Sequence, residues 1–302
     1  MWVEGRILAD FDREIAHKQL YYHNRDHVNT VCRRASQLFR AMRPSLADYP
    51  ADTLARLEGL LALCAIAHDA IQIFAPQDLP HTARRREAGT SEAATIERLI
   101  GHITDLNQVL APSSPVRFTE ADLHILREAI GATICAYDPA DQAIYQPSLY
   151  QSGSPLSPVA HMLALADIGA LGIDGVAFYN QEGSLLFLEE NPDIIPLLVN
   201  GDIPTLQAHC PDLYENLRQR LLRRARFQVS FARSRLARYP RETAGLPPEA
   251  VLAFTHQVFK HLTQRTIRLV ESTTPTDEHT SLEVLMAFFQ FERYLQAPDS
   301  RQ

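Results

Sequence analysis

The chain has 302 residues, of which 46% are hydrophobic and 22% are charged, and its formal net charge is −7. This composition is typical of a folded globular protein and argues against intrinsic disorder. The acidic surplus argues against general nucleic-acid binding, which usually requires a basic surface.

The four cysteines lie far apart and form no Cys-x-x-Cys pair, which favours free thiols in a reducing compartment. The first residues lack the apolar core of a signal peptide, and no apolar run approaches the roughly 18 residues of a membrane span. We therefore expect a soluble, cytoplasmic protein without a membrane partner.

Helical spacing of apolar residues recurs along the chain and predicts an all-α fold. The predicted helices cover residues 51–74, 92–110, 120–136, 156–171, 205–238, 248–271 and 279–295. Stretches rich in Pro, Gly and Ser predict loops at 75–82, 111–118, 145–158 and 243–249. Two helix starts carry capping residues, Thr90 or Ser91 in one case and Thr119 with Asp122 in the other.

The first unusual polar stretch is LYYHNRDHV, residues 20–28. His23 and His27 are four residues apart, so a helix would place them on one face. The pattern predicts either a surface feature or one edge of a metal site.

Two further helices carry acidic residues in apolar surroundings. His68 and Asp69 interrupt LLALCAIAHDAIQIF, residues 60–74, and Asp167 is the only acid of VAHMLALADIGALG, residues 159–172. An ionised carboxylate in such surroundings is costly unless a partner or a cation compensates it. One cation could serve both aspartates.

His27, His68, Asp69 and Asp167 together supply two imidazoles and two carboxylates. Such a mixed nitrogen and oxygen set suits a divalent ion: Mn, Fe, Zn, Co or Mg. Asp69 could bridge to a second ion, so one or two ions are expected. The chemistry that follows is attack of a metal-activated water on an electrophile.

The order of these residues resembles the HD-domain superfamily of metal-dependent phosphohydrolases, over roughly residues 15–175. YHNRDHV is similar to the Tyr-His-Asn-x-x-His element of its cyclic-nucleotide phosphodiesterase-like branch. The resemblance implies an HD-type metal-binding helical domain over 1–180, with a C-terminal helical extension over 181–302 packed on it. It assigns metal binding to His27, His68, Asp69 and Asp167, and makes His23 the proton donor to the leaving oxygen.

The resemblance also implies roles for two further residues. Glu92, in the acidic segment that follows the His-Asp helix, would hydrogen-bond metal-bound water, or it would simply favour the start of its helix. Thr133 occupies the position of a family threonine and is a candidate substrate contact, although the histidine that often follows is missing. The His-Pro-Gly, Gly-Tyr-Pro and Glu-Asp elements that mark particular branches are also missing.

Two arginine-rich segments are candidates for anion binding. PHTARRREAGTSE, residues 80–92, places Arg84 and Arg85 shortly after the metal pair, as phosphate contacts or as a solvated loop. Residues 216–238 carry eight arginines, which favour the charged face of a long helix over a nucleic-acid site. The apolar stripe 284–295 predicts either core or the face of a homodimer.

The leading hypothesis is a metal-dependent phosphohydrolase whose partner is a small phosphorylated substrate, with nucleotides among the candidates. The alternative is a catalytically silent metal-binding HD module that acts as a sensor or interaction protein. A third reading, a di-iron oxygenase of the same superfamily, would need further ligands from His81, His102, His124 or His161.

Overall fold

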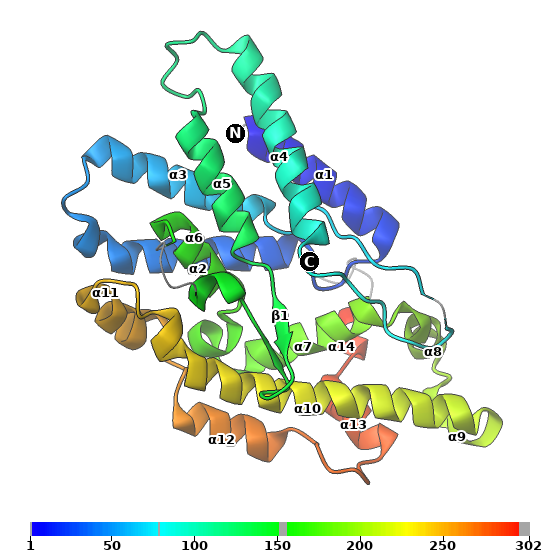
Figure 1. Cartoon of the computed structure of the whole chain (residues 1–302). Helices are drawn as coiled ribbons and strands as arrows, with labels where there is room; N and C mark the ends of the chain where they lie inside the picture. The colour runs from blue at the N-terminus through cyan, green and yellow to red at the C-terminus, as the bar shows by residue number, and fades with distance from the viewer. Residues whose placement is uncertain (1, 78, 151–155, 296–302) are drawn as a thin grey trace, which may run out of the picture.

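The computed structural model describes residues 2–77, 79–150 and 156–295 (Figure 1). Parts of two predicted loops, at 78 and 151–155, lie outside the described residues. The all-α prediction is confirmed. Across the described ranges, the one sheet is an antiparallel ribbon in which β1 (Ala136–Asp138) pairs with β2 (Ala143–Tyr145).

The helices follow one another along the chain with mostly short connections. They are α1 (Trp2–Lys18), α2 (Arg25–Met42), α3 (Ala51–Ala67), α4 (Thr90–Val109), α5 (Glu120–Gly131), α6 (Pro158–Asp167), α7 (Val176–Glu190), α8 (Ile195–Asn200), α9 (Ile203–His209), α10 (Pro211–Glu242), α11 (Pro248–Ala253), α12 (Gln264–Thr273), α13 (Leu282–Phe289) and α14 (Glu292–Leu295). Short 3-10 or π-helical turns cover Arg43–Leu46, Pro147–Tyr150, Ala170–Asp174, Pro192–Ile194 and Phe254–Val258.

The predicted helix 51–74 is too long, because α3 ends at Ala67. Side chains from neighbouring helices bind the backbone amides that would have continued it. The amide of Ile71 donates to Thr95, that of Gln72 to Glu14 and that of Ile73 to Ser91. The helix therefore stops where α1 and α4 offer better-placed acceptors, and His68 and Asp69 lie at its end.

Other helix predictions were also wrong in detail. The helix predicted over 120–136 ends at Gly131, and Ala136 already begins β1. Residues 205–238 form two helices, because the backbone of Cys210 is not helical (φ −143°, ψ 68°) just before Pro211. Residues 248–271 are interrupted after Val258, and residues 279–295 are interrupted at Gln290, whose φ is 50°. Apolar periodicity continues across each break, so it could not reveal them.

The predicted helices omitted α1, α2, α7 and α8. The buried face of α7 includes Gly183, Ser184 and Glu189, so this helix has no apolar stripe to recognise. Its burial comes from packing against neighbouring helices, which the sequence pattern does not reveal.

The helix starts were predicted with mixed success. Thr119 and Asp122 form the expected capping box at α5. At α4 the N-cap is Gly89 at φ 83°, in place of the predicted Thr90 or Ser91. A left-handed backbone at this position suits glycine, and it frees the Ser91 hydroxyl for Ile73.

Two main hydrophobic cores form the interior. The first joins α1 to α6 and also includes buried residues from Tyr239 to Phe259. The second lies between α7, α9, α10 and α13, and Leu285 and Phe289 of the predicted apolar stripe are buried there. The division at residue 180 stays a prediction, and α10 contributes to both cores. No described helix is long and apolar enough to cross a membrane.

Candidate metal centre

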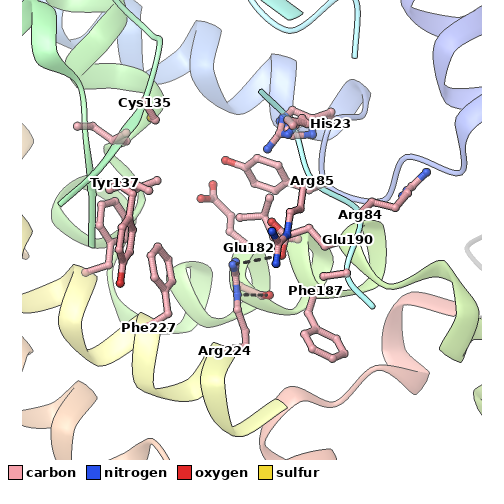
Figure 2. A pocket seen from close by; sticks show the side chains of 18 of the residues that line it. His23, Arg84, Arg85, Cys135, Tyr137, Glu182, Phe187, Glu190, Arg224 and Phe227 are labelled. Carbon is pink, nitrogen blue, oxygen red and sulfur yellow. Dashed lines mark hydrogen bonds and ion pairs between the residues drawn. The ribbon is translucent and has the colours of Figure 1, made fainter. Parts of the chain in front are cut away.

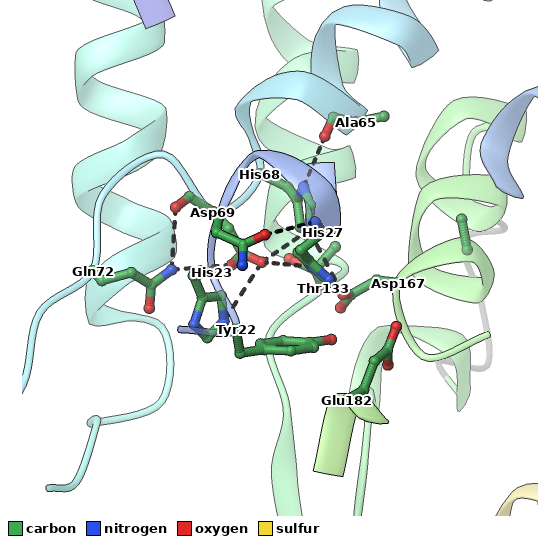
Figure 3. A network of polar contacts seen from close by, with 12 residues as sticks. Tyr22, His23, His27, Ala65, His68, Asp69, Gln72, Thr133, Asp167 and Glu182 are labelled. Carbon is green, nitrogen blue, oxygen red and sulfur yellow. Dashed lines mark hydrogen bonds and ion pairs between the residues drawn. The ribbon is translucent and has the colours of Figure 1, made fainter. Parts of the chain in front are cut away.

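Three helices that pack on one another bring the four predicted ligands together. His27 lies in the first turn of α2, His68 caps the C-terminus of α3, Asp69 follows it, and Asp167 ends α6. α2 packs on both α3 and α6. The ends of these helices therefore meet at one point, which Figure 3 shows from close by.

The four side chains form a compact group that could hold one metal ion. One ligand atom from each lies within 4.8 Å of all the others. His27 Nε2 is 3.2 Å and His68 Nε2 is 2.9 Å from Asp69 Oδ2, and Asp167 Oδ1 is 3.8 Å and 3.6 Å from the same two nitrogens. Ligands bound at about 2.0–2.2 Å from a central ion would lie at such separations.

The hydrogen bonds around the histidines favour metal ligation. His68 Nδ1 donates to the carbonyl of Ala65 at 3.0 Å, so Nε2 is the ring nitrogen that faces the cluster and would ligate a metal. His68 Nε2 and both ring nitrogens of His27 are buried and have no hydrogen-bond partner among the described residues. Buried polar atoms without a partner are rare, and a cation would satisfy two of these three.

The charges in the cluster are strongly coupled. Burial raises the pKa of Asp69, but His68, His23 and His27 outweigh it and hold that pKa well below its ordinary value. Burial lowers the pKa of His68, but Asp69 and Asp167 outweigh it and raise that pKa well above its ordinary value. A cation that binds here therefore displaces a proton from His68.

Two glutamines donate hydrogen bonds to the carboxylates of Asp69 and Asp167. Gln72 Nε2 donates to Asp69 Oδ1 and Gln146 Nε2 donates to Asp167 Oδ2, both at 3.2 Å. Such contacts orient a ligand and tune its basicity.

His23 does not lie in a helix with His27, although the four-residue spacing predicted that it would. It does not share a helix face with His27, because α2 begins only after Asn24, whose side chain accepts from the amides of Asp26 and His27. The two rings still converge, with centroids 5.9 Å apart, and His23 Nε2 is 3.6 Å from Asp69 Oδ2.

Glu189 of α7 fixes the His23 ring. Its Oε1 accepts from His23 Nδ1, and its Oε2 accepts from the backbone amides of Tyr22 and His23, both at 3.0 Å. Burial raises the pKa of Glu189, but His23 and Arg86 outweigh it and lower that pKa to about 2. Glu189 is therefore ionised at neutral pH, and its negative charge faces Nδ1 of His23.

A cavity of about 880 Å³ opens in front of the cluster (Figure 2). Asp69, Asp167 and His23 line one end of it, and α7 and α10 line the opposite end. The two carboxylates of the cluster are therefore accessible to a ligand much larger than a phosphate.

The three consecutive arginines after α3 have different environments. Arg84 donates to the backbone carbonyls of Glu189 and Lys18, both at 2.8 Å, and stacks on Phe74. Arg86 donates to His23 Nε2 at 3.0 Å and to Gln72 Oε1 at 2.7 Å. Arg85 points into the cavity (Figure 2). Of the two predicted arginines, Arg84 is thus largely committed to the backbone.

Glu92 and Thr133 both line the cavity. Burial raises the pKa of Glu92, and the charges of Asp69 and Asp167 raise it further. The hydroxyl of Thr133 donates to the carbonyl of Ile130 at 2.8 Å, so only its lone pairs are free in this arrangement.

Glu189 and Arg86 were missed by sequence reasoning. One signal was available for Glu189, which follows the apolar run SLLFL just as Asp69 follows an apolar run in α3. Nothing in the sequence distinguishes Arg86 from the two arginines before it.

The extra ligands required by the di-iron reading lie elsewhere. His102 pairs with Asp10, His81 with Asp193, and His161 with the carbonyl of Glu242. His124 is not part of the cluster either.

Comparison with known proteins found no match to this chain: no family model, no curated protein and no solved structure is significantly similar to it.

Proposed function

We propose that this protein is a metal-dependent phosphohydrolase that cleaves a phosphate ester or anhydride. One observation carries the proposal: a buried set of two imidazoles and two carboxylates, with unpartnered ring nitrogens, opens onto a cavity that also contains His23 and Arg86. His27, His68, Asp69 and Asp167 would hold the ion. When bound, a divalent cation supplies Lewis-acid activation of water and neutralises charge on the phosphate.

Arg86 is the best-placed residue to bind a phosphate oxygen next to the cluster. Its guanidinium bridges His23 and Gln72 at the cavity wall, and an arginine fork matches phosphate geometry. This role replaces the one expected for Arg84.

His23 would donate a proton to the leaving oxygen from Nε2. Glu189 holds Nδ1–H and stabilises the charged ring, so it acts as a positioning residue. Since Arg86 now donates to Nε2, it must turn from His23 to the substrate phosphate before Nε2 can carry a proton. Glu92 would accept a hydrogen bond from the attacking water.

A silent metal-holding module remains the second candidate. The bond from Arg86 to His23 Nε2 favours it, because a capped Nε2 is not a proton donor.

The test combines metal analysis with a screen of phosphomonoesters, cyclic nucleotides and nucleoside triphosphates. We expect Asp69→Ala to lose metal and activity, and His23→Gln to keep metal but lose activity. The matched control is Asp48→Ala, at an exposed acid outside the cavity. Bound metal without turnover on any compound would favour the silent module.

A further inference from the structure

The cavity extends from the metal cluster across to α10. Its volume of about 880 Å³ lies in the range of about 300–1,000 Å³ that is typical of pockets for whole organic ligands. A phosphate at the cluster would therefore leave most of the cavity to the rest of the substrate.

The arginines of α10 show which chemistry the far end favours. Within the described part of the chain, every arginine of residues 216–238 except Arg223 forms an ion pair with an acidic side chain. Arg223 is exposed, lines the cavity, and has no ion pair or hydrogen bond with another described residue. The interpretation of residues 216–238 as the charged face of a long helix thus accounts for the other arginines but not for Arg223.

Arg85 also lines the cavity, and it lies near Arg224, the residue that follows Arg223 in α10 (Figure 2). Its side chain also has no hydrogen-bond or ion-pair partner in the described ranges, and Figure 2 shows it reaching toward Glu190 and Arg224. This contrasts with Arg84 and Arg86, which both bind protein groups.

The third guanidinium at this end is only loosely paired. Arg224 Nη1 is 3.8 Å from Glu190 Oε2, and its Nε donates to the carbonyl of Gly183 at 3.2 Å. Arg85, Arg223 and Arg224 all line the cavity, and among the described residues only Arg224 of the three has an acidic partner, Glu190. The guanidinium groups of Arg85 and Arg223 therefore keep their donors free. Guanidinium groups with free donors suit phosphate or carboxylate oxygens.

We propose that Arg85, Arg223 and Arg224 bind a second anionic group of the substrate, either a phosphate or a carboxylate. The inference rests on the proposed function only for the first phosphate, which faces the metal cluster. Tyr137 and Phe227 lie together on one side of the cavity (Figure 2), so an apolar or planar linker would suit the space beside them. The substrate class is then an organic phosphate with an anionic group at each end.

The test measures binding by calorimetry on the full-length, metal-loaded protein. The probes are α,ω-alkanediol bisphosphates of increasing length, ω-phosphoalkanoates of matched length, and alkyl monophosphates. At the best length, we expect the bisphosphate or the phosphoalkanoate to bind at least about tenfold more tightly than the monophosphate. The stronger of the two classes identifies the second group.

The same measurement on arginine variants tests which side chains bind the second anionic group. Arg223→Gln and Arg85→Gln should each reduce the preference for the doubly anionic probe severalfold, and Arg223→Lys should retain part of it. Arg226→Gln is the matched control, because this exposed arginine of α10 binds Glu278 and does not line the cavity. Circular dichroism verifies that each variant is folded.

Equal affinity of the wild type for both kinds of probe, no binding of either, or a preference that survives in both glutamine variants would overturn the proposal. Calorimetry requires no turnover. A protein that hydrolyses nothing but retains the Arg223-dependent preference would refute the proposed function and leave the second anion site intact.

Discussion

Glu189 accepts a hydrogen bond from His23 Nδ1 across 166 residues of sequence. The same carboxylate accepts the backbone amides of Tyr22 and His23, so it fixes both the ring and the segment before α2. The buried Glu189 thus links α7 to the candidate metal site formed by α2, α3 and α6.

This link predicts the effect of Glu189→Gln. Because the amide cannot stabilise a charged His23, kcat should fall by about 10- to 100-fold while the metal content stays unchanged. The pH profile of kcat should also shift, which a purely structural role would not cause. Glu97→Gln, at an exposed acid of α4, is the control. An unchanged pH profile would argue against the positioning role.

Metal removal should destabilise the protein. A cation that binds only the folded state, present at about 100 times its dissociation constant, adds about 2.7 kcal/mol to the free energy of unfolding. We expect a chelator to lower Tm in the wild type and in Asp48→Ala, but not in Asp69→Ala. If Asp69→Ala responds to chelation as the wild type does, the cation binds elsewhere.

Substitutions of Arg84 and Arg86 should differ in their effects on stability and on substrate binding. Arg84→Gln removes donors from the carbonyls of Glu189 and Lys18, and should lower the free energy of unfolding by about 1–3 kcal/mol. Arg86→Gln removes donors from His23 and Gln72 and should raise KM, which Arg84→Gln should leave nearly unchanged. Urea unfolding and steady-state kinetics on both variants decide this, and the opposite pattern would assign the phosphate contact to Arg84.

The capping box of α5 gives a prediction on acid stability. Burial raises the pKa of Asp122, but hydrogen bonds from Arg56 and Thr119 outweigh it and bring the pKa below its ordinary value. Its contribution to stability is therefore present above the ordinary aspartate pKa and is lost as the pH falls through the lowered value.

Asp122→Asn should thus lower the free energy of unfolding by about 1–2 kcal/mol at neutral pH. The difference from wild type should disappear in strong acid, as urea unfolding at several pH values would show. Glu120→Gln, at an exposed acid of the same helical turn, should have little effect at any pH. A difference that persists in strong acid would contradict this account.

The sequence by itself determined the helical class and the four residues of the cluster. Helical periodicity reports burial directly, and a carboxylate such as Asp69 or Asp167 in an apolar run requires compensation wherever it lies. Both signals are local, so neither depends on knowing the rest of the fold.

Only the tertiary structure decided where α3 ends, how His23 reaches the cluster, and which arginines are free. Thr95, Glu14 and Ser91 bind the amides that end α3, and all three are distant in sequence. Arg84, Arg85 and Arg86 are chemically identical, and their environments differ only because the backbone around them directs one to carbonyls, one to the cavity and one to His23. Side-chain partners of this kind are set by packing between helices, which a linear pattern does not encode.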